Sequence, residues 1–576
     1  MKRNEIKFWL YLFLLNSLLF LPGYLFNSNT SNFIPYRGFI EGSLYERFKY
    51  LIVRDNYDVF RISVDLFLLV FLYYFLRNRI GSGIYGLIAG IYYAIILYFL
   101  TYYNAFEKIF LITPMMYNDL AMLKLGFFNS GGASFLKSSG IILALIAFSV
   151  GLILAVKKLI HFTSLLQLGI YSKTIMAVLA VLLLFSTGKS GLTPELNQTF
   201  HEAFVMIFNN CRSSVEAYKN LKNFIVPEFN KQLDYNNFTL SEKPDLYLIF
   251  IESYGKILYQ REEFRKTYLH CLDSCALTLT QHGWNAVSNF SVSPVSGGKS
   301  WISYTSVMFG YNIRNQGTYN ALLKDPQMSG YDNIFQVLRH KGYVTFRLNA
   351  MPQNPKIKIP WEIYSRFYSV DKWIHFTDMN YKGRLYGFGP SPPDQFSINF
   401  ADEYLKRTYS GPFAMFFITQ TTHNPFFAPD SLLQDWHRLR EIQNSGSFHA
   451  SVFFKKPKSS DYLRAVCYDI KALTQFINSK ADRNAIFILI GDHQPPVISG
   501  RQDGFETPIH IISRNKEFTE AFLQYGFQKG MEITGDSPIH HEGVYSMFML
   551  EFVRAYGKEY GRLPEYMPFG LNPIAP

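Results

Sequence analysis

Five long apolar segments occupy most of the first 190 residues, and they restrict the possible folds of this chain more than any other feature. They lie at residues 8 to 26, 58 to 77, 82 to 103, 140 to 156 and 174 to 186. A helix needs about 20 apolar residues to cross the hydrocarbon core of a bilayer, and the last two segments are near the lower limit of length. The sequence therefore predicts a transmembrane domain over residues 1–190, with about five helices.

Basic residues between these segments predict the orientation of this domain. They gather in the short loops of one side, at Lys2, Arg3, Lys7, Arg77, Arg79, Lys157, Lys158 and Lys173. Because loops rich in Lys and Arg stay in the cytoplasm, we expect the N-terminus inside and, after five crossings, the rest of the chain outside. The large C-terminal region is therefore predicted to be extracytoplasmic.

The formal net charge of +12 could indicate a nucleic-acid partner. Lys and Arg are scattered along the chain, however, and they form no basic stripe and no known nucleic-acid-binding motif. We therefore expect no nucleic acid, and we attribute the positive charge to contact with anionic lipid at the membrane.

Four cysteines say little about the fold. Cys271 and Cys275 are the only close pair, and on a helix they would share one face. A strained disulfide and two separate thiols are both compatible with this spacing, and no spacing typical of a zinc finger is present.

The pattern changes after the last apolar segment. Residues 191–240 are rich in Asn, Phe and Lys and are predicted to be a helical connector. From residue 241 to 576, short apolar runs alternate with amphipathic helical stretches. The runs expected to be strands are Leu246 to Ile251, Tyr343 to Leu348, Phe413 to Ile418, Ile486 to Ile490 and Ile509 to Ser513. Such alternation predicts an α/β domain with a mainly parallel sheet and helices on both faces.

Two of these predicted strands end at residues that can bind a metal. The run at 246 to 251 stops at Glu252, and the run at 486 to 490 stops at Gly491, Asp492 and His493. Ligands in open α/β sheets gather at the carboxyl ends of the strands. An Asp, Glu and His set at one edge suits a divalent cation such as Zn²⁺ or Mn²⁺, so we predict that Glu252, Asp492 and His493 bind one.

A glycine-rich loop from Ser293 to Ser300 precedes a stretch that can form a helix. Its Gly-Lys-Ser ending suggests a phosphate-binding P-loop, but that pattern needs glycine at the position of Ser293. A hydroxyl at a helix N-terminus, close to a metal, would have a lowered pKa and could act as a nucleophile. We predict this role for Ser300, the alternative being that Ser300 only caps the helix.

A histidine follows the apolar run at 413 to 418, in the segment Thr421-Thr-His-Asn-Pro-Phe426. Its place just beyond a predicted strand, with Asn-Pro-Phe turning the chain behind it, predicts that His423 reaches the same edge of the sheet. There it could bind the metal or donate a hydrogen bond to a substrate phosphate.

The order of these motifs along the chain resembles that of the alkaline phosphatase and sulfatase superfamily. The motifs are Glu252, Gly-Lys-Ser300, His423 before Asn-Pro-Phe, and Gly-Asp492-His493. The resemblance is greatest to its membrane-anchored phosphotransferases, the lipoteichoic acid synthases and phosphoethanolamine transferases. It implies an alkaline-phosphatase-like fold in which Glu252, Asp492 and His493 bind the metal. Ser300 would be the nucleophile and fourth ligand, and His423 a substrate contact.

The chain departs from this family in some positions. Those transferases usually have Thr where this chain has Ser300, although alkaline phosphatases use serine. True sulfatases need a Cys/Ser-x-Pro-x-Arg motif, which the sequence after Ser300 lacks. Lys299 is predicted to contact the substrate, and Trp361 and Arg366 could correspond to the Trp and Arg that bind phosphoglycerol in the synthases.

His540 and His541 are candidates for a second metal site of the phosphoethanolamine-transferase type, or for a surface turn. The resemblance also implies a multi-pass protein of the bacterial plasma (inner) membrane with a periplasmic catalytic domain. It would transfer phosphoethanolamine or phosphoglycerol from phosphatidylethanolamine or phosphatidylglycerol to an envelope glycan or lipid.

Two alternatives remain open at this point. A hydrolase of the same fold would use water as the acceptor. A membrane scaffold or transporter would have a non-catalytic outer domain; charged residues inside the spans favour transport, and Asp65 is an isolated example in the second segment.

Overall fold

The computed structural model describes the chain in several stretches, and everything below concerns these. They are residues 3–27, 43–45, 47, 57–120, 135–166, 169–170, 172, 174–175, 178, 200–222, 233–325, 331–352, 361–387, 390–442, 457–480 and 483–573. The chain divides into two compact units. The first comprises Met1–Lys108, Thr113–Met116 and Ser130–Val215, and the second comprises Ile109–Ile112, Tyr117–Asn129 and Glu216–Pro576.

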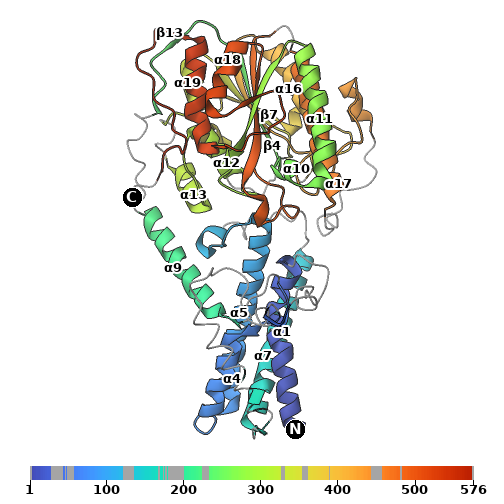
Figure 1. Ribbon diagram of the computed structural model, residues 1–576, viewed down its shortest axis with the longest axis vertical. Helices are drawn as coiled ribbons and strands as arrows, with labels where there is room; N and C mark the ends of the chain where they lie inside the picture. The colour runs from blue at the N-terminus through green and yellow to red at the C-terminus, as the bar shows by residue number, and fades with distance from the viewer. Residues whose placement is uncertain are drawn as a thin grey trace. The chain divides into compact units, whose positions relative to one another are not determined.

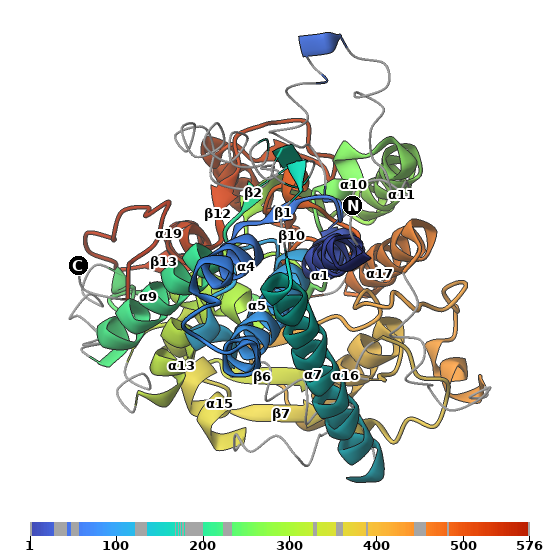
Figure 2. The same cartoon turned by 90° about the horizontal axis from the view of Figure 1, so that it is seen from below.

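The first unit is built from apolar helices. They are α1 (Arg3–Asn27), α4 (Val64–Leu76), α5 (Ser82–Phe110) and α7 (Phe135–Ser164), which Figure 2 shows from below. Three helical stretches are long and apolar enough to cross a membrane, Arg3–Asn27, Ser82–Phe110 and Ile142–Ser164. α4 has 13 residues, which is short for a span, and most of the predicted fifth segment, 174 to 186, lies outside the described residues. The predicted apolar helical domain is present, but the count of five is not confirmed.

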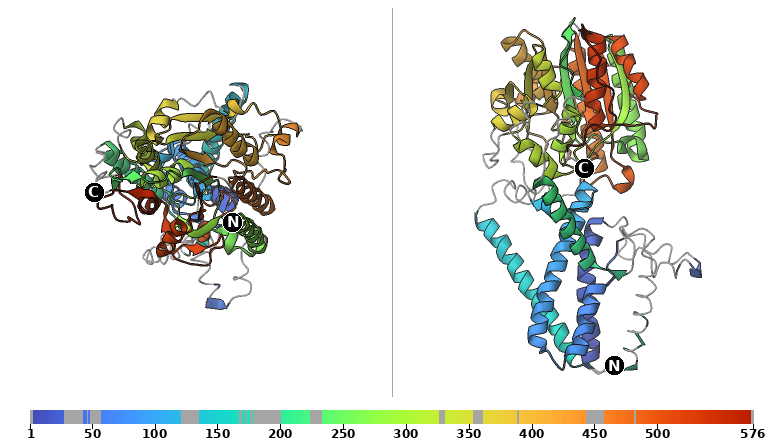
Figure 3. Two further views of the ribbon diagram at one scale, coloured as in Figure 1. Left: turned by 90° about the horizontal axis from the view of Figure 1, so that it is seen from above. Right: turned by 90° about the vertical axis from the view of Figure 1, so that its left-hand side faces the viewer.

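Contacts inside this unit are those of a packed helical bundle. Figure 3 (right) draws α1, α4 and α5 in blue, and the hydroxyl of Tyr93 in α5 donates to the carbonyl of Leu15 in α1 at 2.7 Å. Asp65, near the start of α4, accepts hydrogen bonds from the backbone N–H groups of Ala203 (2.7 Å) and Phe204 (3.0 Å). These residues begin α9 (Ala203–Lys222), so Asp65 serves as a helix cap. Asp65 therefore has a structural role at the start of α9, and it gives no support to the transporter alternative.

The second unit contains a nine-stranded mixed sheet, shown in the upper part of Figure 1. Its strands are β4 (Asp245–Ile251), β5 (Asn285–Val292), β6 (Val344–Asn349), β7 (Lys372–His375), β8 (Phe413–Ile418), β9 (Ala485–Gly491), β10 (Glu506–Ser513), β11 (Gln528–Lys529) and β12 (Ile539–His540). The order is β11-β5-β10-β9-β4-β8-β6-β7, with β12 beside β5. β9, β4, β8, β6 and β7 are parallel, whereas β10 is antiparallel to both of its neighbours.

The expected parallel arrangement thus holds for one part of the sheet only. β10 was expected as a further parallel strand, but the 14 residues between β9 and β10 contain only a short 3₁₀ turn, Arg501–Asp503. A parallel connection needs a crossover, usually a helix, and without one the chain returns antiparallel. β5 was not expected at all, because its Asn and Ser residues hide the strand pattern.

Helices cover both faces of the sheet, so β4 and β9 are buried along their whole length. One face packs against α12 (Ser300–Phe309), α13 (Gln316–Lys324), α14 (Ile334–His340), α18 (Lys516–Glu520) and α19 (Val544–Tyr556). The other packs against α11 (Glu262–Gln281), α16 (Asp394–Thr408) and α17 (Ser459–Asn478). Between α11 and α17 lie Cys271, Cys275 and Cys467, which are free thiols.

Candidate active site

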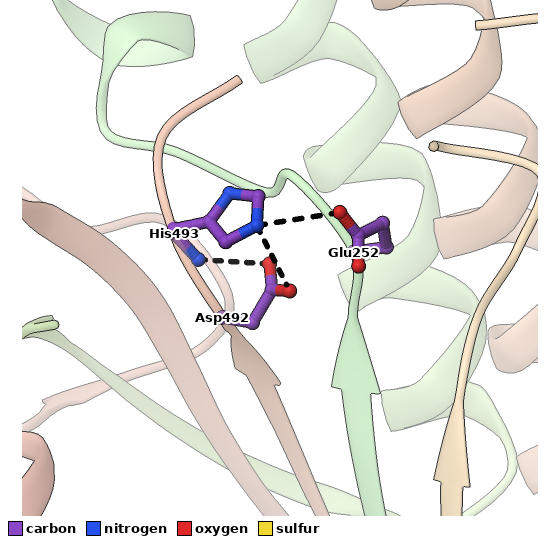
Figure 4. A group of neighbouring side chains, drawn as sticks. All are labelled: Glu252, Asp492 and His493. Carbon is purple, nitrogen blue, oxygen red and sulfur yellow. Dashed lines mark hydrogen bonds and ion pairs between the residues drawn. The ribbon is translucent and has the colours of Figure 1, made fainter. Parts of the chain in front are cut away.

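The two central strands of the sheet end side by side. In the parallel pair β4 and β9, Ile251 lies opposite Gly491, so Glu252 and Asp492 leave the sheet at the same level, with His493 next to Asp492. Figure 4 shows that the three side chains point toward one another. The structure thus brings the three predicted metal ligands together, with potential ligand atoms within 4.8 Å of one another.

Hydrogen bonds to the backbone determine which atoms of Asp492 and His493 face this cluster. Oδ1 of Asp492 accepts from the N–H groups of Ser253 (2.7 Å) and His493 (2.8 Å). Nδ1 of His493 donates to the carbonyl of Gln494 at 2.9 Å, so Nε2 of the neutral ring carries the lone pair. Nε2 lies 3.4 Å from Oε1 of Glu252 and 3.4 Å from Oδ2 of Asp492. A partner on the second ring nitrogen orients a histidine for metal binding in this way.

The cluster has the electrostatics of a divalent metal site. Among the described residues, no hydrogen-bond donor reaches Oδ2 of Asp492, although this atom is buried. Burial and then the charge of Asp492 raise the pKa of Glu252 well above its usual range. A cation bound between the two carboxylates and Nε2 of His493 would give Oδ2 of Asp492 a partner. It would also offset the repulsion between the carboxylates of Glu252 and Asp492. Two carboxylates and an imidazole therefore fit the predicted Zn²⁺ or Mn²⁺.

The hydroxyl of Ser300 lies beside this cluster. Its Oγ donates to Oε2 of Glu252 at 3.2 Å and lies 3.1 Å from Nε2 of His493. Ser300 is the first residue of α12, and Lys299, in the left-handed conformation at φ 64°, occupies the N-cap position. Ser300 is therefore not the helix cap, and its hydroxyl points at the metal ligands from the positive end of the helix dipole.

The loop before Ser300 is attached to the strand that carries the ligands. Gly297 and Gly298 have φ values of 67° and 142°, and the second is accessible almost only to glycine. The hydroxyls of Ser293 and Ser303 both donate to the carbonyl of Asp492, at 2.6 and 2.7 Å. The loop from Ser293 to Ser300, the first turn of α12 and the end of β9 are thus held together around one carbonyl oxygen.

His423 reaches the same edge of the sheet. Its Nδ1 donates to the carbonyl of Asn424 at 2.8 Å, and its Nε2 lies 4.0 Å from Oε1 of Glu252. Burial lowers the pKa of His423, so its ring is neutral at neutral pH and Nε2 is an acceptor. This geometry allows His423 to contact a substrate bound at Ser300.

Lys299 has a partner that the sequence did not indicate. Its ammonium forms an ion pair with Oδ1 of Asp119 at 3.1 Å and lies 4.8 Å from the ring centre of Phe110. The side-chain oxygen of Asn118 accepts from the N–H of Gly317 at 3.2 Å. Within the second unit, the segment around Asn118 and Asp119 therefore packs beside the loop from Ser293 to Ser300. In this structure the ammonium of Lys299 is bound to Asp119. Its contact with a substrate stays a prediction.

Trp361 and Arg366 are not brought into the cluster. They lie in α15 (Trp361–Tyr368), where the ring of Trp361 contacts that of Trp373 at 4.5 Å between centres. Arg366 is exposed. No hydrogen bond or ring contact between described residues joins either of them to Ser300 or to the metal ligands, and their role as headgroup contacts remains a prediction.

His540 and His541 have different surroundings. Nδ1 of His541 is bonded to the hydroxyl of Ser291 at 2.8 Å, and Nε2 lies 3.1 Å from the carbonyl of Gly491. His541 thus connects β5, through Ser291, to the end of β9, through Gly491. Nδ1 of His540 lies 3.8 Å from Glu542. Within the described residues, the cluster of Glu252, Asp492 and His493 is the one group of three metal-binding side chains.

Comparison with known families assigns the catalytic unit. Residues 276–521 match the family model described as Sulfatase. Over these residues the chain is similar to that family. The match confirms the prediction that the chain contains an enzyme domain of the alkaline phosphatase and sulfatase superfamily. No curated protein matches the chain.

Several solved structures resemble the chain at low identity. Lipooligosaccharide phosphoethanolamine transferase A (EptA) from Neisseria meningitidis is 11% identical, with 85% of this chain and 88% of that one covered and a TM-score of 0.42. The lipoteichoic acid synthase LtaP from Listeria monocytogenes is 14% identical, with 62% and 80% covered and a TM-score of 0.37. The phosphoglycerol transferase GacH from Streptococcus pyogenes, in complex with sn-glycerol-1-phosphate, is 12% identical, with 60% and 85% covered and a TM-score of 0.35. Identities this low say nothing of the substrate of this chain.

Proposed function

We propose that this protein is a metal-dependent transferase that moves a phospho-headgroup from a phospholipid, through a covalent intermediate on Ser300, to a hydroxyl of an envelope glycan or lipid. The observation that carries the proposal is the position of Ser300. Its Oγ lies 3.2 Å from Glu252 and 3.1 Å from His493, at the N-terminus of α12. A hydroxyl so placed beside a metal-binding set is suited to attack a phosphodiester.

Glu252, Asp492 and His493 would hold the cation, a Zn²⁺ or Mn²⁺ ion, with Ser300 as the fourth ligand. The cation would supply Lewis-acid stabilisation of the negative charge that develops on the phosphoryl oxygens. N–H groups at the start of α12 would bind a non-bridging oxygen of the substrate.

In the first step, Oγ of Ser300 bonds to phosphorus while the bond from phosphorus to the diacylglycerol oxygen breaks. The proton of Ser300, directed at Oε2 of Glu252, ends on the released diacylglycerol. In the second step, a hydroxyl of the acceptor bonds to phosphorus and the bond to Oγ of Ser300 breaks. Nε2 of the neutral His423 accepts the proton of that hydroxyl and passes it to Oγ of Ser300, so both residues return to their starting states.

The apolar helices support a lipid substrate. Among the described residues, three helices are long and apolar enough to span a membrane, and they would keep the active site near both a lipid donor and a membrane-bound acceptor. An enzyme for soluble esters would not need them. We therefore propose phosphatidylethanolamine or phosphatidylglycerol as the donor, in the bacterial inner membrane with the catalytic unit on the periplasmic side.

The experiment that tests this function is product analysis with the purified protein. Each phospholipid, labelled in its headgroup, is incubated with protein and an envelope glycolipid fraction, and the mass of any adduct on Ser300 is measured. We expect labelled glycolipid and a headgroup adduct on Ser300, both absent in Ser300→Ala. Ser296→Ala, in the same loop, is the matched control and should keep activity.

Two outcomes would change the proposal. Release of free phospho-headgroup without labelled glycolipid would identify a hydrolase, which shares the same first step. An adduct on Ser296, or full activity of Ser300→Ala, would refute the assignment of Ser300 as nucleophile.

A further inference from the structure

Two buried carboxyl groups lie behind the loop that carries His423. Asp394 is the first residue of α16 and Asp469 lies in the middle of α17, and both are 0% exposed. The charge of Asp394 raises the pKa of Asp469, so the two carboxyl groups lie near each other. Two buried carboxylates repel one another, and a proton on one of them removes that repulsion.

The neighbours of Asp394 show which group carries that proton. Its two oxygens accept from the backbone N–H of Gln420, both at 2.9 Å, and from that of Thr421 at 2.6 Å. A carboxylate suits these donors, so Asp394 is the ionised member. Among the described residues no hydrogen-bond donor reaches Oδ1 of Asp469, and burial followed by the charge of Asp394 raises the pKa of Asp469 well above its usual range. Asp469 is therefore the protonated member of the pair.

A chain of hydrogen bonds connects this pair to the active site. The N–H of Glu252 donates to the hydroxyl of Thr419 at 3.1 Å, which lies 2.9 Å from that of Thr422. The hydroxyl of Thr422 donates to Oδ2 of Asp469 at 3.2 Å. The path runs from the backbone of Glu252 through the two hydroxyls to Asp469. The pair thus holds every residue from 419 to 422, and His423 follows directly.

We propose that Asp394 and Asp469 are positioning residues that fix the loop from 419 to 423 and so place His423 beside Glu252. Neither touches the substrate or the metal ligands. The consequence for the reaction rests on the role of His423 in the proposed function, but the consequence for the loop does not.

The two members of the pair should respond differently to the same substitution. Asp469→Asn keeps a donor for Asp394 and an acceptor for Thr422, because a carboxamide has the shape of the protonated acid. Asp394→Asn turns an acceptor into an N–H donor facing the N–H groups of Gln420 and Thr421. A buried donor without an acceptor is costly, so only Asp394→Asn should release the loop.

The experiment combines hydrogen exchange with steady-state kinetics on the full-length protein in detergent. The variants are Asp394→Asn, Asp469→Asn, His423→Ala and the double variant Asp394→Asn/His423→Ala. Peptides covering residues 419 to 426 should exchange faster only in Asp394→Asn and in the double variant. In Asp394→Asn, kcat should fall by about 10- to 100-fold, the loss expected from misplacing a catalytic group by about an ångström. In Asp469→Asn, kcat should stay within about twofold of the wild-type value. The double variant should be no slower than His423→Ala.

Each contrary result has a distinct meaning. Unchanged exchange in Asp394→Asn would show that the pair does not hold the loop. Losses of kcat that multiply in the double variant would show that the pair does not act through His423. An Asp469→Asn variant as slow as Asp394→Asn would overturn the position of the proton.

A wild type without transferase activity would refute the proposed function and leave the exchange result to decide the inference about the loop. If Asp394→Asn does not fold, Thr422→Val replaces it. This change removes the hydroxyl between the loop and Asp469 and keeps the shape of the side chain. Unaltered exchange and unaltered kcat in Thr422→Val would then refute the proposal.

Discussion

Replacing Asp119 with alanine should destabilise the nucleophile loop by about 3–5 kcal/mol, the usual cost of breaking a buried ion pair from one side. The side chains of Lys299 and Asp119 are 4% and 3% exposed, and their charged atoms are 3.1 Å apart. At an effective dielectric constant of about 20, the attraction at that distance is about 5 kcal/mol. Without Asp119, the ammonium of Lys299 stays buried beside the ring of Phe110, which replaces only part of that energy.

The reverse change, Lys299→Met, should cost less. Methionine keeps the apolar stem of lysine, and Asp119 has other interactions besides that with Lys299. In the double variant Asp119→Ala/Lys299→Met no ammonium remains buried, so most of the loss caused by Asp119→Ala should be recovered.

The assay is hydrogen exchange of the peptide covering residues 297 to 303, together with thermal unfolding in detergent, for the wild type and these three variants. We expect faster exchange and the lowest Tm in Asp119→Ala, and recovery in the double variant. A double variant with the summed losses of the two single variants, or an Asp119→Ala protein as stable as the wild type, would show that Lys299 is not held by Asp119.

Three further results should follow from the site. Chelation with EDTA should lower the Tm of the wild type but not that of Asp492→Asn, because only the wild type loses a cation that stabilises the folded state; an equal shift in both would place the metal elsewhere. Trp361→Ala and Arg366→Ala should raise KM about tenfold with little change in kcat if they contact the headgroup, and unaltered KM for both donors would end that prediction. Between pH 5 and 7, Asp469→Asn should gain stability over the wild type as pH rises, because burial holds the pKa of Asp469 well above its usual range. The folded wild type then keeps a proton that the unfolded chain releases, so its stability falls as pH rises. Tm measured across this range checks it, and a difference independent of pH would place the proton elsewhere.

The central part of the fold could be predicted because its strands are apolar without interruption. The runs that became β4, β8 and β9 are buried on both faces, and such runs are characteristic of parallel strands. β5 could not be recognised, since its alternating Asn and Ser side chains resemble a loop. They bond instead to partners far along the chain, as Ser288 does to His510 at 2.6 Å.

The same contrast applies to the site. Glu252 and Asp492 could be placed together because each directly follows a strand, and the register of β4 and β9 brings strand ends to one level. The partners of Lys299 and of the loop at residue 420 could not be predicted. They depend on packing between Asp119 and Lys299, 180 residues apart, and between α16 and α17, and no local pattern marks such pairs.

The pairing of β4 with β9 also determines when this active site can exist during synthesis. Asp245 in β4 lies opposite Ala485 in β9, so the first central strand leaves the ribosome about 240 residues before its partner. At synthesis rates of about 5–20 residues per second, that interval is roughly 10 to 50 s. Throughout it, a seven-residue apolar strand has no neighbour on the β9 side and is prone to aggregation. The nascent chain therefore depends on protection until β9 arrives, and no metal can be bound by Glu252, Asp492 and His493 before then.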